Sequence, residues 1–89
     1  MKDFKLFYLK NCPYCKRVFR YLEELRLENP QYAALELEMI DERKEADLAN
    51  SFDYYYVPTF YYKDTKLFEG KMTKEDVQNV LQQVVDAQG

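Results

Sequence analysis

The sequence has no histidine and no tryptophan, and it has only two cysteines among its 89 residues. Structural zinc usually takes four ligands from cysteine and histidine. One copy of this chain offers only two such ligands, so a zinc site would require a homodimer. Both cysteines lie in one Cys-x-x-Cys, at Cys12 and Cys15. This spacing differs from that of secreted disulfide scaffolds and favours a redox, catalytic or metal-binding pair.

The sequence also lacks the patterns of membrane, secreted and nucleic-acid-binding proteins. No run of 18 apolar residues is present, so we expect no membrane span. The opening stretch MKDFKLFYL has no small-residue cleavage site, so we expect no signal peptide and a cytoplasmic location. The formal net charge is −3 with both signs spread along the chain, which argues against a basic surface for nucleic acid.

The patterns that are present predict one small α/β domain spanning residues 1–89. Hydrophobic residues make up 47% of the chain, enough for one core. The expected strands are 4–9, 35–39, 59–62 and 67–69, and the expected helices are 13–28, 42–52 and a closing helix after Thr73. The order β-α-β-α-β-β-α predicts a four-stranded mixed sheet flanked by three helices, because a strand-helix-strand unit makes parallel strands and a hairpin adds antiparallel ones.

Specific residues are expected to delimit the helices. Asn29-Pro30 should stop the first helix, and Asp41 should cap the start of the second. Thr73, with Asp76 three residues later, resembles a capping box for the last. The charged runs DERKEAD (41–47) and TKED (73–76) are interpreted as solvated helix starts without a functional site.

The cysteine pair stands at the predicted junction of the first strand and the first helix. Cys12 falls at the helix N-terminus, where unpaired N–H groups and the helix dipole stabilise the thiolate, the reactive form. Cys15 lies one turn further in. We therefore expect Cys12 to attack a substrate disulfide and Cys15 to resolve the mixed disulfide. Positive charge on Lys10, Lys16 and Arg17 should favour the thiolate further.

Two alternatives remain open for the pair. It could hold a metal or an iron–sulfur cluster, provided that a second subunit supplies further ligands. It could also be a structural disulfide, although so short a loop removes little entropy from the unfolded chain. The interpretation as a redox pair is preferred because of the ligand count.

Two motifs together resemble the thioredoxin-like superfamily, and glutaredoxins most closely. The first is CPYC after a strand, and the second is VPT at Val57 to Thr59, before the third strand. The resemblance implies a cis Pro58 packed against the cysteines and a Val57 backbone that pairs with an extended substrate. It also places Tyr14 and Lys10 beside bound glutathione. Glutaredoxins usually carry the basic residue three positions before the first cysteine, whereas Lys10 precedes Cys12 by two.

A tyrosine-rich stretch, DYYYVPTFYY (53–62), surrounds this proline. We expect Tyr56 to contact substrate, with Tyr54 and Tyr55 either at that surface or in the core. Tyr61 and Tyr62 should point to opposite faces of the sheet, because side chains alternate along a strand.

The resemblance implies a dithiol-disulfide oxidoreductase without a bound cofactor. Expected substrates are disulfide-containing proteins or small thiols. Glutathione, as reductant or co-substrate, or a flavoprotein reductase would donate electrons. We expect a monomer that binds neither nucleic acid nor membranes. The alternative function is a carrier that uses Cys12 to bind glutathione or an iron–sulfur cluster.

Overall fold

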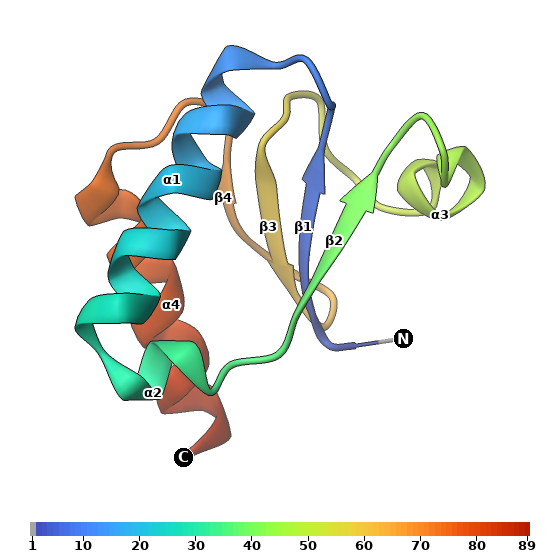
Figure 1. The fold of residues 1–89 in the computed structure, drawn as a ribbon. Helices are drawn as coiled ribbons and strands as arrows, with labels where there is room; N and C mark the ends of the chain where they lie inside the picture. Colours follow the sequence, from blue (N-terminus) through green and yellow to red (C-terminus); the bar gives the residue numbers. More distant parts are fainter. Residues whose placement is uncertain (1) are drawn as a thin grey trace.

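The computed structural model describes residues 2–89 and contains one four-stranded sheet with helices on both faces (Figure 1). The elements are β1 (Phe4–Tyr8), α1 (Pro13–Glu28), α2 (Pro30–Ala33), β2 (Leu37–Asp41), α3 (Ala46–Asn50), β3 (Thr59–Tyr62), β4 (Thr65–Glu69) and α4 (Lys74–Gln88). The strand order is β2-β1-β3-β4; β1 and β2 run parallel, and β3 and β4 extend the sheet in the antiparallel sense. The predicted mixed α/β fold is confirmed.

Two apolar clusters hold the layers together. α1 and α4 cover one face of the sheet, and α3 lies on the other (Figure 1). Phe4 and Leu6 of β1 belong to the larger cluster with α1 and α4, while Phe7 belongs to a smaller cluster that includes Ala49 of α3. Side chains alternate along a strand, so β1 is buried from both sides and gives the loop that follows it a rigid base.

The prediction of a helix over residues 42–52 was wrong in its first half. Residues 42–45 form turns, and α3 begins only at Ala46. Asp41 ends β2 rather than capping a helix, and its carboxylate accepts a hydrogen bond from the Arg43 N–H at 2.9 Å. An aspartate that bonds the backbone two residues ahead stabilises a turn in place of a helix.

Other boundaries differ by a few residues. Asn29 ends α1 as expected, but its side chain also accepts from the Gln31 N–H at 2.9 Å and caps the unpredicted helix α2, with Pro30 in its first turn. β2 begins at Leu37 instead of residue 35, and its Met39 is exposed because β2 is an edge strand. β4 begins at Thr65 instead of residue 67, which shortens the hairpin turn.

The expected start of α4 is confirmed as a full capping box. The Thr73 hydroxyl accepts from the Asp76 N–H at 3.1 Å, and the Asp76 carboxylate accepts from the Thr73 N–H at 3.0 Å. Across residues 2–89, no helix combines the length and the apolar character that crossing a membrane requires.

Candidate active site

The loop between β1 and α1 places Cys12 at the first turn of the helix. The Cys12 N–H donates to the Leu9 carbonyl at 3.2 Å, which closes the turn after β1. Cys12 is the N-cap residue of α1, and Pro13 follows in the first helical turn, where its missing N–H costs nothing. The Cys15 N–H donates to the Cys12 sulfur at 3.3 Å. The predicted position of Cys12 at the helix N-terminus is confirmed, and its sulfur takes the place of the side-chain oxygen that usually caps a helix.

The two cysteines have different surroundings. Both are free thiols, Cys12 half-buried and Cys15 completely buried. Burial raises the pKa of Cys15 to about 12, and the neighbouring Cys12 contributes in the same direction. Cys15 is therefore held as a protonated thiol behind a more accessible sulfur. This asymmetry is what an attacking and a resolving cysteine require.

The proline loop lies against this sulfur. The peptide bond between Val57 and Pro58 is cis, so that expectation is confirmed. The Val57 carbonyl oxygen lies 3.9 Å from the Cys12 sulfur, which can donate to it. Pro58 is buried, and its carbonyl accepts from the Gly70 N–H at 2.8 Å. Two segments that are 45 residues apart in the sequence thus form one site.

A carboxylate holds the backbone just before Val57. The N–H groups of Tyr55 and Tyr56 both donate to Glu69, which also pairs with Lys66 at 2.8 Å. Within residues 2–89, the N–H of Val57 has no acceptor. The loop is therefore anchored by its neighbours while the Val57 amide stays available to an incoming chain.

The stabilisation that the Glu69 carboxylate gives this loop should depend on pH. Its hydrogen bonds to Lys66 and to the two tyrosine amides lower its pKa from 4.5 to about 2. The unfolded chain therefore takes up the proton first as pH falls, and the stabilisation is present above the unfolded value and lost toward about pH 2.

We expect Glu69→Gln to have a lower free energy of unfolding than wild type at about pH 7, and we expect this difference to disappear by about pH 2.5. Urea unfolding of both proteins at the two pH values measures the difference. Glu23→Gln, on the exposed face of α1, is the matched control, with one carboxylate removed from a residue without a salt bridge among those described. An equal difference at the two pH values would contradict the expectation.

The tyrosines divide into an exposed and a buried group. Tyr55 and Tyr56 are 83% and 70% exposed, beside the loop, so Tyr56 is accessible as expected. Tyr54 instead packs into the smaller cluster, stacked on Phe7 at 4.9 Å. Tyr61 and Tyr62 point to opposite faces as predicted, because Tyr61 joins the smaller cluster and Tyr62 packs against the larger one.

Basic residues lie near Cys12, and sequence reasoning missed two of them, Arg43 and Lys71. Lys10 lines a pocket of about 210 Å³ together with Cys12, as expected, and Arg43 lines it as well. The Arg17 guanidinium lies over the Tyr14 ring at 5.7 Å from its centroid, and the Lys71 ammonium lies over the same ring at 5.9 Å. Arg43 belongs to the 41–47 run, whose sequence pattern predicts a solvated surface without a site; it is exposed, and it lies beside the thiol. Parallel β1 and β2 end at the same edge, which was the available signal.

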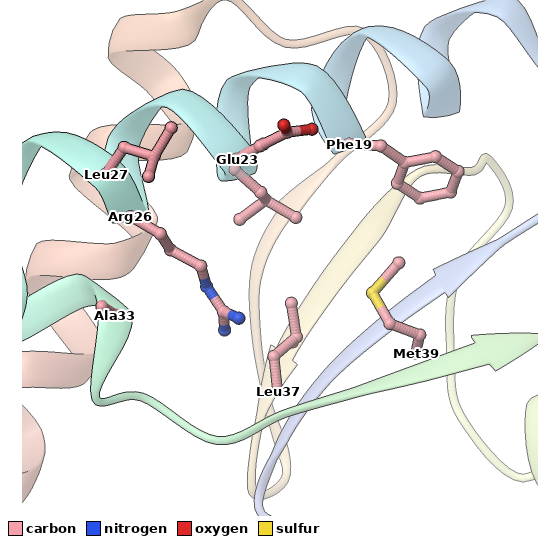
Figure 2. Close-up of a pocket in the computed structure, with 8 residues that line it drawn as sticks. Phe19, Glu23, Arg26, Leu27, Ala33, Leu37 and Met39 are labelled. Carbon is pink, nitrogen blue, oxygen red and sulfur yellow. The ribbon is translucent and has the colours of Figure 1, made fainter.

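A second, more apolar pocket of about 500 Å³ lies between α1 and β2, away from the cysteines. Figure 2 shows side chains of α1, including Phe19, facing Leu37 and Met39 of β2. The Arg26 guanidinium extends into this space and donates to the Leu35 carbonyl at 3.0 Å. This pocket contains no thiol, so it does not contribute to chemistry at Cys12.

The mixed sheet, the cysteine pair at the start of α1 and the facing cis-proline define a member of the thioredoxin-like superfamily. Residues 6–73 match the family model described as glutathione S-transferase, N-terminal domain, and the chain belongs to that family. The human ERp44 zinc-bound form is a structural neighbour with a TM-score of 0.61 and 17% sequence identity. The match covers 94% of this chain and 27% of the ERp44 chain, so it shows a shared fold within a much longer protein. Comparison with curated proteins gives no match.

Proposed function

We propose that this protein is a glutaredoxin-like thiol-disulfide oxidoreductase. The observation that carries the proposal is the contrast within the cysteine pair. The Cys12 sulfur is partly accessible at a helix N-terminus, and Cys15 is a buried thiol whose N–H bonds that sulfur at 3.3 Å. A thiolate at such a helix end is a good nucleophile, and a buried partner cannot compete with it for substrate.

The reaction follows from this arrangement. The Cys12 thiolate attacks one sulfur of a substrate disulfide, so that a bond between Cys12 and substrate forms while the substrate disulfide breaks. The departing substrate sulfur takes up a proton. Cys15 then loses its proton and attacks the Cys12 sulfur, which releases the second substrate thiol. The substrate gains two electrons and two protons, and the protein is left with a disulfide between Cys12 and Cys15.

The proline loop supplies the docking contact. An extended substrate segment can accept a hydrogen bond from the N–H of Val57 while its sulfur approaches Cys12, because the Val57 carbonyl lies 3.9 Å from that sulfur. Tyr14 and Tyr56 are both exposed and offer apolar contact with a polar hydroxyl. Turnover in a reducing compartment, for which we propose the cytoplasm, requires glutathione or a flavoprotein reductase to restore the two thiols.

Reduction of insulin and of a small mixed disulfide would test the proposal. Each substrate is assayed with glutathione plus its reductase, and separately with thioredoxin reductase. We expect disulfide reduction with at least one donor, and the effective donor identifies the subgroup. Absence of reduction with both donors, and with pre-reduced protein alone, would refute an oxidoreductase. A brown dimer that absorbs visible light would favour the cluster-binding alternative.

A further inference from the structure

The surface around Cys12 carries a set of exposed cations without carboxylate partners. In the part of the chain that the structure describes, residues 2–89, ion pairs are formed by Lys2, Arg20, Lys66 and Lys74. The cations near Cys12 are outside this group. They are Lys10, Lys16, Arg17, Arg43 and Lys71, all of them exposed. We call these five residues the basic rim.

The basic rim reaches the site in two groups. Lys10 and Arg43 line the pocket of about 210 Å³ that also contains Cys12 and Asp41. Arg17 and Lys71 lie over the ring of Tyr14, which stands two residues after Cys12. Lys16 lies in the first turn of α1, where its N–H donates to the Cys12 carbonyl at 3.0 Å. A substrate that reaches the sulfur therefore comes close to several cations.

Three carboxylates near the site are held by hydrogen bonds, and Asp41 and Glu42, whose donors are neutral, keep their negative charge. Asp41 is buried and accepts from the Arg43 N–H at 2.9 Å. Glu42 accepts from the Tyr54 hydroxyl at 2.7 Å, and Glu69 is held by Lys66 and two amides. Along α1, the first acidic residue is Glu23, about three turns beyond Cys12.

The charge distribution is thus polarised. The chain as a whole has a formal net charge of −3. Within residues 2–89, the five cations of the basic rim nevertheless outnumber Asp41 and Glu42, the carboxylates beside the cysteines that form no ion pair. A basic patch on an acidic protein attracts and orients anionic partners and repels cationic ones. Tyr55 and Tyr56 precede Val57 in the proline loop, and their exposed aromatic rings offer contact area to a peptide.

We propose that the substrates of this protein are disulfides in acidic protein segments, with aspartate or glutamate beside the reacting cysteine. This inference rests on the proposed oxidoreductase function and names its substrate class. A peptide docked through its backbone on Val57 would pass along the basic rim. Its flanking carboxylates would then meet Lys10 and Arg43 at the Cys12 pocket and Arg17 and Lys71 beside Tyr14.

Three peptides that differ only in flanking charge provide the test. Each carries one cysteine in a disulfide with the same reporter thiol, flanked by aspartates, serines or lysines. Stopped-flow measurement gives the rate constant at which each peptide oxidises the reduced protein. We expect the aspartate peptide to react at least about tenfold faster than the lysine peptide at low ionic strength. The difference should shrink as salt is added, because exposed charges are screened.

Two charge reversals distinguish the effect of the basic rim on the reaction rate from the effect of the protein's net charge. Lys71→Glu should lower the ratio of the aspartate-peptide rate to the serine-peptide rate by at least about threefold. Lys63→Glu makes the same change in the turn between β3 and β4, at the opposite end of β1 beside Asp3, and should leave the ratio unchanged. Equal effects of the two reversals would show that net charge alone, and not the basic rim, determines the preference, and would overturn the proposal.

The outcomes also distinguish this inference from the function on which it rests. Equal rates for the three peptides, independent of salt, would overturn the acidic-substrate proposal while leaving the oxidoreductase intact. A rate for oxidised glutathione above that of the aspartate peptide, with Lys71→Glu affecting only the former, would assign the rim to a small anion and contradict the proposal. Failure of every disulfide to oxidise the protein would refute the oxidoreductase itself.

Discussion

Replacing Cys12 with serine should abolish disulfide reduction, a loss of at least about 10³-fold. A serine hydroxyl is not ionised at neutral pH, so the variant has no nucleophile where the Cys12 sulfur lies against the Val57 carbonyl. Cys15 cannot take over the attack, because it is fully buried and its pKa is raised to about 12. The measurement is the rate of insulin reduction with each electron donor.

This substitution is informative because it should leave the fold intact. Serine is among the preferred N-cap residues, and its oxygen can accept the Cys15 N–H that the sulfur now accepts. The melting temperature should therefore change little. Retention of reductase activity by Cys12→Ser would contradict the role of Cys12. A lower melting temperature for Cys12→Ser would contradict the expectation that the serine oxygen replaces the sulfur as the cap, and Cys12→Ala, which lacks a cap, should be the less stable of the two variants.

The sequence was sufficient for those parts of the fold that depend on local pattern. The strand at Thr59–Tyr62, the extent of α1 and the start of α4 follow from alternation, helical spacing and caps, and the structure agrees. The helix prediction for the segment after β2 was wrong because two local preferences compete there. Asp41 can cap a helix or bond its own backbone in a turn, and the second arrangement occurs next to the end of β1.

Some residues of the candidate site could also be predicted from the sequence, and others could not. Cys12 and Cys15 could be placed at the start of the first helix because their motif and its position after a strand are readable from the sequence, and Pro58 was placed beside them by the resemblance to the thioredoxin-like superfamily. Glu69 and Arg43 could not, because their roles depend on which loops meet at the sheet edge. An isolated charged run looks like a solvated surface, and only the tertiary structure shows that one of its members borders the thiol.

Replacing Cys15 with serine should trap the mixed disulfide between Cys12 and the substrate, whereas replacing Cys12 prevents it from forming. Cys12 keeps its environment, since the backbone N–H of residue 15 still bonds its sulfur. Attack on a substrate disulfide should proceed, but no thiol remains to release the product. We expect a covalent adduct of protein and substrate to accumulate to nearly one per protein, visible by mass spectrometry and removed by a reducing agent.

Because residue 15 is buried, the experiment needs a control for a loss of stability. A serine hydroxyl in an apolar site costs about 1–3 kcal/mol of stability when it finds no partner. Cys15→Ala avoids that penalty and should trap the same adduct, whereas Cys12→Ser should trap none. In wild type, the resolving step should accelerate as pH rises, because the raised pKa of Cys15 leaves little thiolate at neutral pH. Release of both substrate thiols by Cys15→Ala without an external thiol would show that Cys15 is not the resolving group.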